Sequence, residues 1–550
     1  MLILDYLIWA AIIVIAITIV VHLSNKRRLT KKIERLRLQW GKPKAENFDF
    51  DAIRKYADVA KADSFHQITE QTIHDIDFYK VFAFVDRTTS RVGQQFLFKK
   101  LIQQGNEPKN PLDTLIEIFA SDSMLRESIQ LEFSKLESRD ANYISSLLTD
   151  NNIKRPKWFW LLYLNVALLI GLFLLSFQFS FCIIVMLAPL TINMFIHYWN
   201  KGNTFQFVRS FPQLNILISV CAAIEKKGSV FVNKQVIASM EELKSFQRKS
   251  VLLSLKNATG LEAELSLIGL YFIELAKIFF LVEVFALFGI LRELKTKQSA
   301  IGTLFSYVGE IDSAISVLSL RSGTLKTCVP DFISAKKEIS VKGIYHPLIE
   351  NCVKNDWVIA GKSMLITGSN MSGKSTYLRT VTINSILAQT IFTCFADRFE
   401  SPPLKQFSSI RIDDNLFEGK SFYFQEVSSV ASLIEASEKD HQNLFVLDEV
   451  FKGTNTVERI ASAKAILSYL NKNNNIVVVA THDIELAEML AREYDLYHFT
   501  ETVESNQLYF DHKLKVGQLK TRNAIKLLEL SDYPSEIIEE AKRISERLNK

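Results

Sequence analysis

The sequence is poor in the features that mark disulfide-bonded or zinc-binding proteins. Its five cysteines, at positions 182, 221, 328, 352 and 394, are scattered and form no C-x-x-C pair. Neither a disulfide framework nor a zinc site is therefore expected, and this usage suits a reducing compartment. The chain also has no internal repeat and no low-complexity tract. Its net charge of +5 is small for 550 residues, so it argues only weakly for nucleic acid and equally for anionic lipid.

Charge is missing altogether from three long apolar stretches, at residues 6–21, 158–175 and 179–198. Each approaches the roughly 20 residues that a helix needs to cross a bilayer. Basic residues flank all three stretches on one side, at 26–32, at 154–157 and at Lys201. The positive-inside rule then predicts an outside N-terminus, a cytoplasmic 23–157, a hairpin out and back, and a cytoplasmic 200–550. The alternative for each stretch is a buried helix of a soluble protein.

The first stretch could also be a cleaved signal peptide. It has no basic segment before it and no A-x-A site after it, and its charges lie on the wrong side, so an anchor is expected. A further apolar segment, 265–291, contains Glu274, Lys277 and Glu283. These charges favour a core helix of an α-helical domain over a fourth membrane span.

Residues 368–375 fit the phosphate-binding pattern G-x-x-x-x-G-K-[ST]. The preceding segment, 363–367, predicts a short buried strand, and the following segment, 376–388, predicts a helix. Glycines allow the loop to curl its N–H groups toward phosphate oxygens, and the helix N-terminus adds partial positive charge. Lys374 is expected to reach the β- and γ-phosphates of a nucleoside triphosphate, and the Ser375 hydroxyl is expected on Mg²⁺. The predicted nucleotide-binding residues are Gly368, Ser369, Asn370, Met371, Ser372, Gly373, Lys374, Ser375 and Thr376.

Two further strands are predicted to end in polar side chains. The apolar run 443–447 leads into Asp448 and Glu449, where Asp448 would hold Mg²⁺ and Glu449 would polarise the attacking water. The run 476–480 leads to Thr481, His482 and Asp483. Ligands of open α/β sheets lie at the carboxyl ends of the strands, so His482 is expected to sense the γ-phosphate or to orient the water. Its alternative is an ordinary loop histidine. Glu449, His482 and Lys374 are therefore the predicted catalytic residues, and Ser375 and Asp448 the predicted metal ligands.

Together these motifs resemble the MutS family of DNA mismatch-repair ATPases. The matching residues are G-S-N-M-S-G-K-S-T at 368–376, D-D-x-x-x-x-G-K-S-F at 413–422, D-E-V-F-K-G-T-N-T at 448–456, T-H-D at 481–483 and Y-H-P-L-I-E at 345–350. The run 86–97 resembles the helical core of the family. The resemblance covers 340–545 well and about 75–345 loosely.

The resemblance implies an ABC-type ATPase that uses ATP and Mg²⁺ and works as a homodimer. Each ATP would lie between the phosphate loop of one subunit and the turn Gly453, Thr454, Asn455 and Thr456 of the other. The amphipathic tail helix, 534–548, resembles a dimer-stabilising segment, and its alternative is a solvated terminal helix. Binding of DNA, including mismatched DNA, is the partner function that the family implies.

The sequence departs from the family pattern in three respects. About fifty residues separate the first apolar stretch from the core, which is too few for mismatch-binding and connector domains. The helical region contains an apolar hairpin and no clamp-like β insertion. Ser369 and Ser372 stand where the mismatch-repair branch usually has Pro and Gly, and Asn455 stands where it has Ser.

The expected fold is a multi-domain combination of α and α/β parts. It consists of a transmembrane anchor (1–23), a basic helical stalk (24–74), a MutS-like helical core (75–157), a transmembrane hairpin (158–198), a second part of the core and lever (199–338), an ABC-type ATPase domain (339–530) and a C-terminal helix (531–550). The expected protein is an ATP hydrolase of the inner membrane, with three spans, a cytoplasmic ATPase domain and a role coupled to DNA. The alternatives are a membrane ATPase for transport, remodelling or regulation of a non-DNA partner, and an assembly scaffold with negligible turnover. An exporter would normally show L-S-G-G-Q and about six spans.

Overall fold

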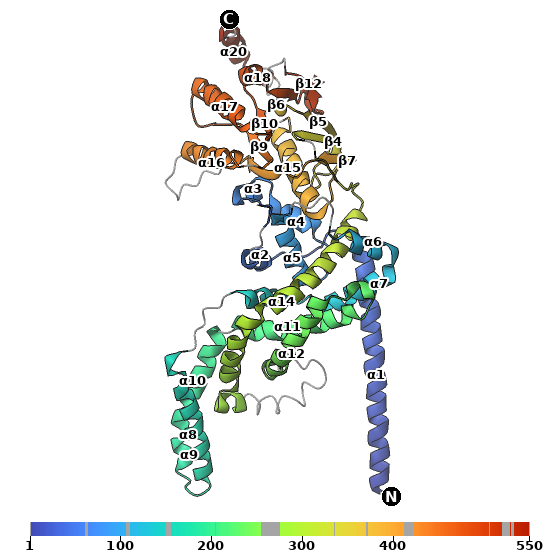
Figure 1. Cartoon of the computed structure of the whole chain (residues 1–550), viewed down its shortest axis with the longest axis vertical. Coiled ribbons are helices and arrows are strands. Elements are labelled where there is room, and N and C mark those ends of the chain that lie inside the picture. Colours follow the sequence, from blue (N-terminus) through green and yellow to red (C-terminus); the bar gives the residue numbers. More distant parts are fainter. Residues whose placement is uncertain are drawn as a thin grey trace. The chain divides into compact units, whose positions relative to one another are not determined.

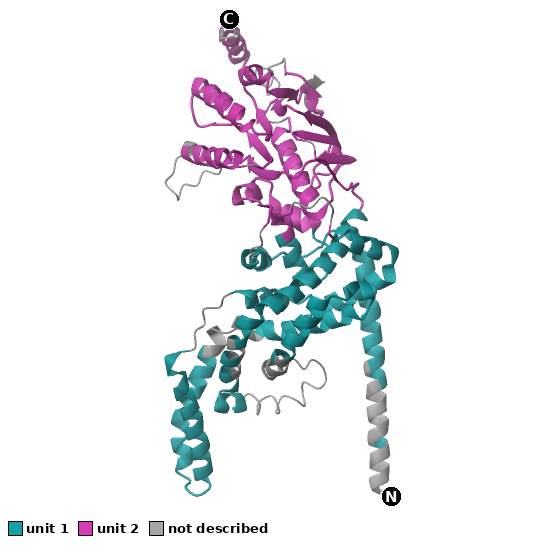
Figure 2. Cartoon of the chain, viewed as in Figure 1, with its two compact units in different colours: residues 1–62, 86–99, 112–322 teal, residues 63–85, 100–111, 323–550 magenta. Residues whose placement is uncertain are grey.

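The computed structural model describes most of the 550 residues. The described ranges are 2–60, 64–105, 111–149, 156–203, 205–254, 275–334, 336–369, 372–411, 422–439, 441–504, 507–519, 528–529 and 533–548. They form two compact units, drawn in different colours in Figure 2. The helical unit contains residues 1–62, 86–99 and 112–322. The α/β unit contains residues 63–85, 100–111 and 323–550.

The helical unit is built from α-helices of very different lengths together with 3₁₀ segments. Its α-helices are α1 (Leu2–Gln39), α2 (Phe50–Val59), α5 (Arg91–Ile102, whose last turn belongs to the other unit), α6 (Asp113–Ser121), α7 (Ser123–Phe133), α8 (Trp160–Ser176), α9 (Cys182–Val185), α10 (Leu187–Asn203), α11 (Phe205–Glu225), α12 (Lys234–Ser254) and α14 (Val282–Arg321). The 3₁₀ turns are η1 (Ser134–Leu136), η2 (Arg139–Leu148), η3 (Lys157–Phe159) and η4 (Ser229–Phe231).

Helix α14 is the central element of this unit, and α5 packs closely on it. A Cβ atom placed on Gly309 would lie 2.3 Å from the Cγ atom of Phe96, so this crossing requires glycine. The buried carboxylate of Asp312 accepts hydrogen bonds from the backbone N–H groups of Thr89 and Ser90 at 2.9 and 2.7 Å, just before α5 begins. Burial raises the pKa of Asp312 to about 6. Asp312 therefore satisfies backbone donors that the start of a helix leaves without intrahelical partners.

The predicted apolar hairpin consists of helices α8 and α10, which lie side by side. Residues 177–181 and the short α9 connect them. Three described helical segments are long and apolar enough to cross a membrane, at 157–176, 182–199 and 293–321. In the first two, only 17% and 22% of the residues are buried within the protein, whereas 67% are buried in the third. The third segment is thus a core segment of α14, and the first two expose apolar side chains.

The hairpin is held together by amide side chains. Asn165 Nδ2 of α8 donates to Asn193 Oδ1 of α10 at 2.7 Å, and Asn193 Nδ2 donates to the carbonyl oxygen of Phe279 at 2.9 Å. Phe159 also packs edge to face on Phe288 of α14, with ring centroids 4.9 Å apart. The uncharged stretch 6–21 lies within α1, although most of its side chains are outside the described set. Much of the apolar segment 265–291 is also outside the described residues.

Two sheets organise the α/β unit, and strands β4, β5, β6, β7, β9 and β10 of these sheets are labelled in Figure 1. The six-stranded sheet has the order β14 (Lys515–Val516), β11 (Tyr494–His498), β6 (Ser363–Thr367), β10 (Ile476–Thr481), β9 (Asn443–Asp448), β8 (Lys405–Ser409). All neighbours are parallel except β14 and β11. The four-stranded sheet has the order β3 (Asp331–Phe332), β7 (Arg398–Ser401), β4 (Glu338–Ile344), β5 (Asn355–Ala360). Two small antiparallel pairs are β1 (His66–Gln67) with β2 (Gln103–Gln104), and β12 (Glu501–Glu504) with β13 (Gln507–Phe510).

Alternating side chains divide the core of this unit into two layers. Met364 and Ile366 of β6 face one layer, with the four-stranded sheet and α15 (Lys374–Ile391). Leu365 faces the other layer, with α16 (Phe422–Ser437), α17 (Thr456–Leu470) and α18 (Ile484–Leu490). A strand covered on both faces needs a continuous apolar run, as β6, β9 and β10 have. The terminal helix α20 spans Ser535–Leu548. The predicted strands before the phosphate loop, at 444–447 and at 476–480, and the predicted helix from 376, are confirmed.

The α/β unit also takes in a segment far away in sequence, which includes α3 (Glu70–Asp75) and α4 (Phe78–Val85). The fully buried carboxylate of Asp75 accepts from Ser408 Oγ at 2.6 Å and from the backbone N–H groups of Ile410 and Arg411 at 3.0 and 2.9 Å. Burial raises the pKa of Asp75, and these hydrogen bonds oppose the shift. The end of β8 is thereby fixed to α3.

Candidate functional site

Three neighbouring parallel strands, β6, β10 and β9, bring the predicted motifs to one edge of the sheet. Thr367, the last residue of β6, pairs with Thr481 of β10, and Ala480 pairs with Asp448 of β9. Because all three strands run in the same direction, the phosphate loop, His482 and the two acids leave the sheet at the same level. This is the edge where ligands of open α/β sheets bind.

The phosphate loop runs from the end of β6 to the N-terminus of α15. Gly373 has φ of +103° and directly precedes the helix, a backbone conformation that residues with a Cβ rarely adopt. The buried Lys374 Nζ donates to the carbonyl oxygens of Gly368 and Ser369 at 2.6 and 2.8 Å. Its ammonium group therefore lies against the loop that it would serve. Burial lowers the pKa of Lys374, and the carboxylates of Asp448 and Glu449 oppose the shift.

The predicted metal ligands are in direct contact. Ser375 Oγ donates a hydrogen bond to Asp448 Oδ2. Burial raises the pKa of Asp448, and the bond from Ser375 opposes that shift. A hydroxyl and a carboxylate side by side are hard oxygen donors, and Mg²⁺ bound with a nucleotide needs few protein ligands besides phosphates and water. The pair therefore fits Mg²⁺. The described residues contain no cluster of three or more His, Cys, Asp or Glu that would form an all-protein metal site.

Glu449 and His482 form the second pair of the site. His482 Nδ1 donates to Glu449 Oε1 at 3.0 Å. Glu449 follows β9 with φ of +55°, and its backbone N–H donates to the carbonyl oxygen of Ala480 at 2.9 Å. A positive φ at a non-glycine residue is energetically unfavourable and recurs at functional sites. This conformation turns Glu449 out of the strand beside the half-exposed His482.

The charges of this pair shift the pKa of each partner in opposite directions. Burial alone would raise the pKa of Glu449, but the hydrogen bond from His482 and the charge of Lys452, 3.5 Å away, hold it at about 2. The hydrogen bond to Glu449 raises the pKa of His482. A carboxylate with so low a pKa is a weak base. Glu449 is therefore suited to orienting and polarising a water molecule rather than to holding its proton.

The turn at 453–456 forms the N-terminus of α17. Asn455 caps this helix by accepting from the backbone N–H of Glu458 at 3.0 Å. The turn is fixed from α16 by Glu426, which is only 1% exposed. Its two carboxylate oxygens accept from the backbone N–H groups of Lys452 and Gly453 at 2.9 and 3.2 Å. Bonds from an amide N–H to an ionised carboxylate are among the stronger hydrogen bonds. Glu426 thus determines how the turn is presented.

A second ion pair fixes the loop that carries His482. Arg459 of α17 binds Asp483 through two nitrogen atoms, with Nε and Nη2 distances of 3.1 and 2.8 Å. Asp483 is 7% exposed, and its backbone N–H donates to Thr481 Oγ1 at 3.1 Å. The helix that begins at the 453–456 turn therefore also positions the neighbour of His482.

A cavity of about 440 Å³ adjoins the phosphate loop. Tyr345, Ile349, Thr376 and His512 are among its lining residues, together with Gly373 and Ser375 of the loop. The ring of His512 stacks on Phe510, and its Nδ1 atom donates to the carbonyl oxygen of Ser372 at 3.1 Å. The cavity offers an aromatic and apolar surface next to the predicted phosphate site.

The structure places the following residues at one end of the sheet: Gly368, Ser369, Ser372, Gly373, Lys374, Ser375, Thr376, Asp448, Glu449 and His482. Asn370, Met371 and residues 413–421 lie outside the described residues. Sequence reasoning did not assign Glu426, Arg459 or His512. Glu426 lies four residues after the D-D-x-x-x-x-G-K-S-F element at 413–422. The sequence does not show that Glu426 contacts the 453–456 turn, so no role could be assigned to it. Arg459 and His512 carry no motif, and only the fold brings them to the site.

Fold and site define the α/β unit as a P-loop domain of the kind that binds nucleoside triphosphates. Residues 364–549 match the family model of MutS domain V. The chain is 34% identical over 233 residues to the DNA mismatch repair protein MutS of Lactobacillus delbrueckii. The aligned region covers 40% of this chain and 27% of that protein. It is 34% identical over 230 residues to the protein of the same name from Listeria monocytogenes, covering 39% and 26%. For Pseudothermotoga lettingae the identity is 32% over 268 residues, covering 46% and 32%.

The C-terminal part of the chain, residues 364–549, matches the MutS family, in agreement with the resemblance. It spans about a third or less of the length of the curated relatives that it matches. The similarity therefore concerns the nucleotide domain and not the whole of those proteins.

Proposed function

We propose that the chain is a membrane-anchored, MutS-like ATPase that binds and hydrolyses ATP. The observation that carries the proposal is the adjacency of Ser375 with Asp448 and of Glu449 with His482 at the end of three parallel strands. Bound Mg²⁺ would neutralise phosphate charge between Ser375 and Asp448. Lys374 would exchange the carbonyl oxygens of its own loop for the β- and γ-phosphates.

Hydrolysis then depends on Glu449 and His482. Arrival of the γ-phosphate beside them would draw the imidazole away from Glu449, because phosphate oxygens compete for its N–H. Release from His482 would raise the pKa of Glu449 from about 2 and make it a better partner for the attacking water. The nucleoside would occupy the cavity lined by Tyr345, Ile349 and His512, where an aromatic ring can stack on the base.

We propose a homodimer as the active form. The turn of Gly453, Thr454, Asn455 and Thr456 would complete the site of the partner subunit, with hydroxyl and N–H groups directed at the γ-phosphate. Its support is the exposure of the turn at the start of α17 and its fixation by Glu426. The C-terminal helix α20, which is amphipathic in sequence, would add to the dimer contact.

Membrane attachment would use α8 and α10 together with the first part of α1. Large apolar side chains are exposed along the hairpin, including Leu164, Phe173, Leu174, Ile184 and Phe195. Such a surface is unfavourable in water and favourable in a bilayer. With the basic flanks on one side, the α/β unit would lie in the cytoplasm at the inner membrane.

Coupling to DNA is the part of the proposal that rests on the family alone. The test measures the affinity of the detergent-solubilised full chain for homoduplex, mismatched and branched DNA at increasing salt concentrations. Each series is measured with and without ATP. Phosphate contacts predict an affinity that falls steeply with salt. The absence of binding at low salt in every nucleotide state would contradict a DNA role and support the alternative, a membrane ATPase that acts on a non-DNA partner.

A further inference from the structure

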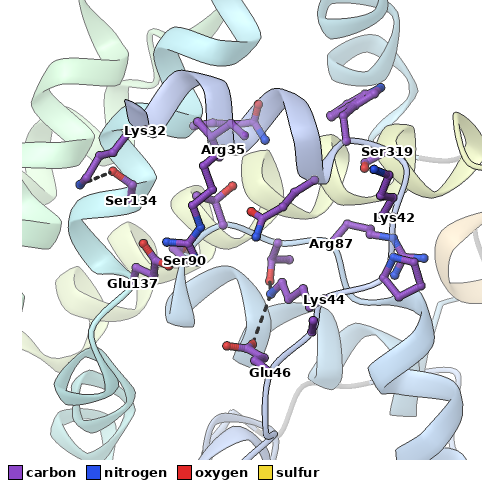
Figure 3. Close-up of a pocket in the computed structure, with 18 of the residues that line it drawn as sticks. Lys32, Arg35, Lys42, Lys44, Glu46, Arg87, Ser90, Ser134, Glu137 and Ser319 are labelled. Atoms are coloured by element: carbon purple, nitrogen blue, oxygen red, sulfur yellow. Dashed lines mark hydrogen bonds and ion pairs between the residues drawn. The ribbon is translucent and has the colours of Figure 1, made fainter. Parts of the chain in front are cut away.

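A basic recess lies in the helical unit, where four separate chain segments meet (Figure 3). They are the last turns of α1 with the residues 40–46 that follow it, residues 87–91 at the start of α5, the end of α7 with η1, and Ser319 on α14. The recess has a volume of about 130 Å³ and is open to solvent on one side. It has no part in the proposed ATP chemistry.

Cationic side chains outnumber carboxylates in its wall. The cations are Lys32, Arg35, Lys42, Lys44, Arg87 and Arg91, whereas the carboxylates are Glu46 and Glu137. Hydroxyl groups of Thr88, Thr89, Ser90, Ser134 and Ser319 complete the polar lining. Most of these side chains can be followed in Figure 3.

Each of the two carboxylates forms an ion pair with one of the arginines of the recess. Arg35 Nη2 lies 3.1 Å from Glu137 Oε1. Arg91 binds both oxygens of Glu46, at 2.9 and 2.8 Å. Lys42 is exposed and forms no ion pair with any described residue. The lining therefore retains an excess of positive charge after its internal pairs are formed.

The carboxylate behind the recess, Asp86, is also fully engaged. It is completely buried and accepts from Lys44 Nζ at 2.7 Å, from Gln94 Nε2 at 2.8 Å, and from the backbone N–H and hydroxyl of Thr88 at 2.9 and 2.6 Å. A carboxylate has about four lone-pair sites, so Asp86 has little capacity to accept more.

Arg87, the next residue, is only 8% exposed and lines the recess. Its Nη1 atom donates to the backbone carbonyl oxygen of Asp86 at 3.2 Å. Burial lowers the pKa of Arg87 to about 10, which still leaves it charged at neutral pH. An anion in the recess would offset the cost of keeping this guanidinium group out of water.

We propose that this recess binds the phosphate group of a small soluble molecule. Guanidinium and ammonium groups with hydroxyls on several sides match the tetrahedral array of phosphate acceptors. The volume admits a phosphoryl group, and the remainder of a larger ligand would extend through the open side. Since the wall joins α1, α5 and α14, occupancy would also tie the stalk helix to the core.

The position of the recess along α1 favours a soluble phosphate ligand over a lipid headgroup. The uncharged stretch ends at Val21, and the first lining residue, Lys32, lies eleven residues further along the same helix. At 1.5 Å per residue this is about 16 Å beyond the apolar boundary. A headgroup at the membrane surface would not reach the recess while α1 stands upright.

The proposal is tested by isothermal titration of the detergent-solubilised full chain with inorganic pyrophosphate. The phosphate loop would bind the same probe, so every protein carries Lys374→Ala, which removes that site. In this background we expect one binding event whose affinity falls steeply with salt. Lys42→Gln and Lys32→Gln, both at exposed positions, should each weaken it about tenfold. Lys226→Gln, an equal charge change on an exposed residue outside the recess, should leave it unchanged.

Two results would overturn the assignment: no heat of binding at low salt, or an equal loss in Lys226→Gln. Folding of each variant is checked by its thermal unfolding midpoint. Repeating the titration in vesicles of anionic and of zwitterionic lipid distinguishes the two sources. Equal affinity in both supports a soluble ligand, whereas a loss confined to anionic vesicles would contradict it and assign the site to a headgroup.

Discussion

Replacement of Glu449 by glutamine is the perturbation that best separates nucleotide binding from hydrolysis. Glutamine keeps the shape of the side chain and an oxygen that can accept from His482, which lies 3.0 Å away. It removes one full negative charge, because a carboxyl with a pKa of about 2 is ionised throughout the physiological range. Lys374, Ser375 and Asp448 are untouched, so ATP affinity should stay close to that of the wild type.

The expected loss concerns the chemical step. A positioned acid or base contributes about 10²- to 10⁴-fold to a rate, and a weak base belongs to the lower half of that range. We therefore expect hydrolysis to fall about a hundredfold to a thousandfold, equivalent to roughly 3–4 kcal/mol in the activation free energy. The variant should accumulate ATP instead of ADP.

The assay is single-turnover hydrolysis of radiolabelled ATP, with ATP binding measured on the same preparation. Glu435→Gln serves as the matched control, because Glu435 is exposed on α16 and, among the described residues, forms an ion pair with Lys439 alone, at 3.7 Å. It should hydrolyse at the wild-type rate. A wild-type rate in Glu449→Gln would refute the role given to Glu449, and a parallel loss of binding would show that the residue acts in affinity instead.

Three further predictions follow from individual contacts. Glu426→Ala should leave two backbone N–H groups without their acceptor, lower the free energy of unfolding by about 1–3 kcal/mol and slow hydrolysis. Gly309→Ala should destabilise the helical unit by about 1–3 kcal/mol, whereas Gly289→Ala on the same helix, with no atom within 4 Å of the added Cβ, should not. The pKa of His482, followed by proton NMR titration, should be raised in the wild type and fall toward its ordinary value in Glu449→Gln.

Each of these predictions has an outcome that contradicts it. If Glu426→Ala has the same free energy of unfolding and the same hydrolysis rate as the wild type, the 453–456 turn keeps its conformation without Glu426. Equal stability of the two glycine variants would show that the α5–α14 crossing can relax. For the pair of His482 and Glu449 the signs follow from the two pKa shifts, which bound the stabilisation on both sides. The pair stabilises the folded protein fully between about pH 4.5 and 6.5, less as the pH rises through the raised pKa of His482, and less as the pH falls toward the lowered pKa of Glu449 at about 2. A pH-independent difference between wild type and Glu449→Gln would contradict the pairing.

Much of the nucleotide site could be predicted from the sequence because its parts are local. The phosphate loop, the acids at 448–449 and His482 each follow a buried strand, and parallel strands bring their ends together without further information. The three strands were therefore predicted to within one residue at each end, and α15 to within three residues. The glycine at 373 was informative for the same reason, since its positive φ is a local requirement.

Residues that act through long-range contacts could not be predicted. Glu426 meets Lys452 and Gly453 only because α16 packs beside the loop after β9, and His512 reaches Ser372 from 140 residues away. Likewise, the sequence gives no sign that Asp75 fixes the end of β8. The basic recess was not predicted either, because its residues come from four segments whose charges are ordinary when each segment is considered alone.

The apolar hairpin was predicted from composition. Its first stretch, 158–175, corresponds closely to α8, whereas the second, 179–198, is divided between α9 and α10, and α10 continues to Asn203. The amide pair of Asn165 and Asn193 inside it was not anticipated, because two asparagines 28 residues apart acquire a meaning only once α8 lies against α10. The exposed apolar side chains of these helices support the proposed insertion into a bilayer.

The central claim is that the α/β unit is a working nucleotide site, and ATP turnover by the full chain in detergent tests it most directly. Wild-type protein with Mg²⁺ should bind and hydrolyse ATP, and Lys374→Ala should do neither, because the loop loses the only described cation that donates to its own carbonyl oxygens. Lys226→Ala should behave as the wild type. Equal ATP binding by wild type and Lys374→Ala, or none by the folded wild type, would contradict the account.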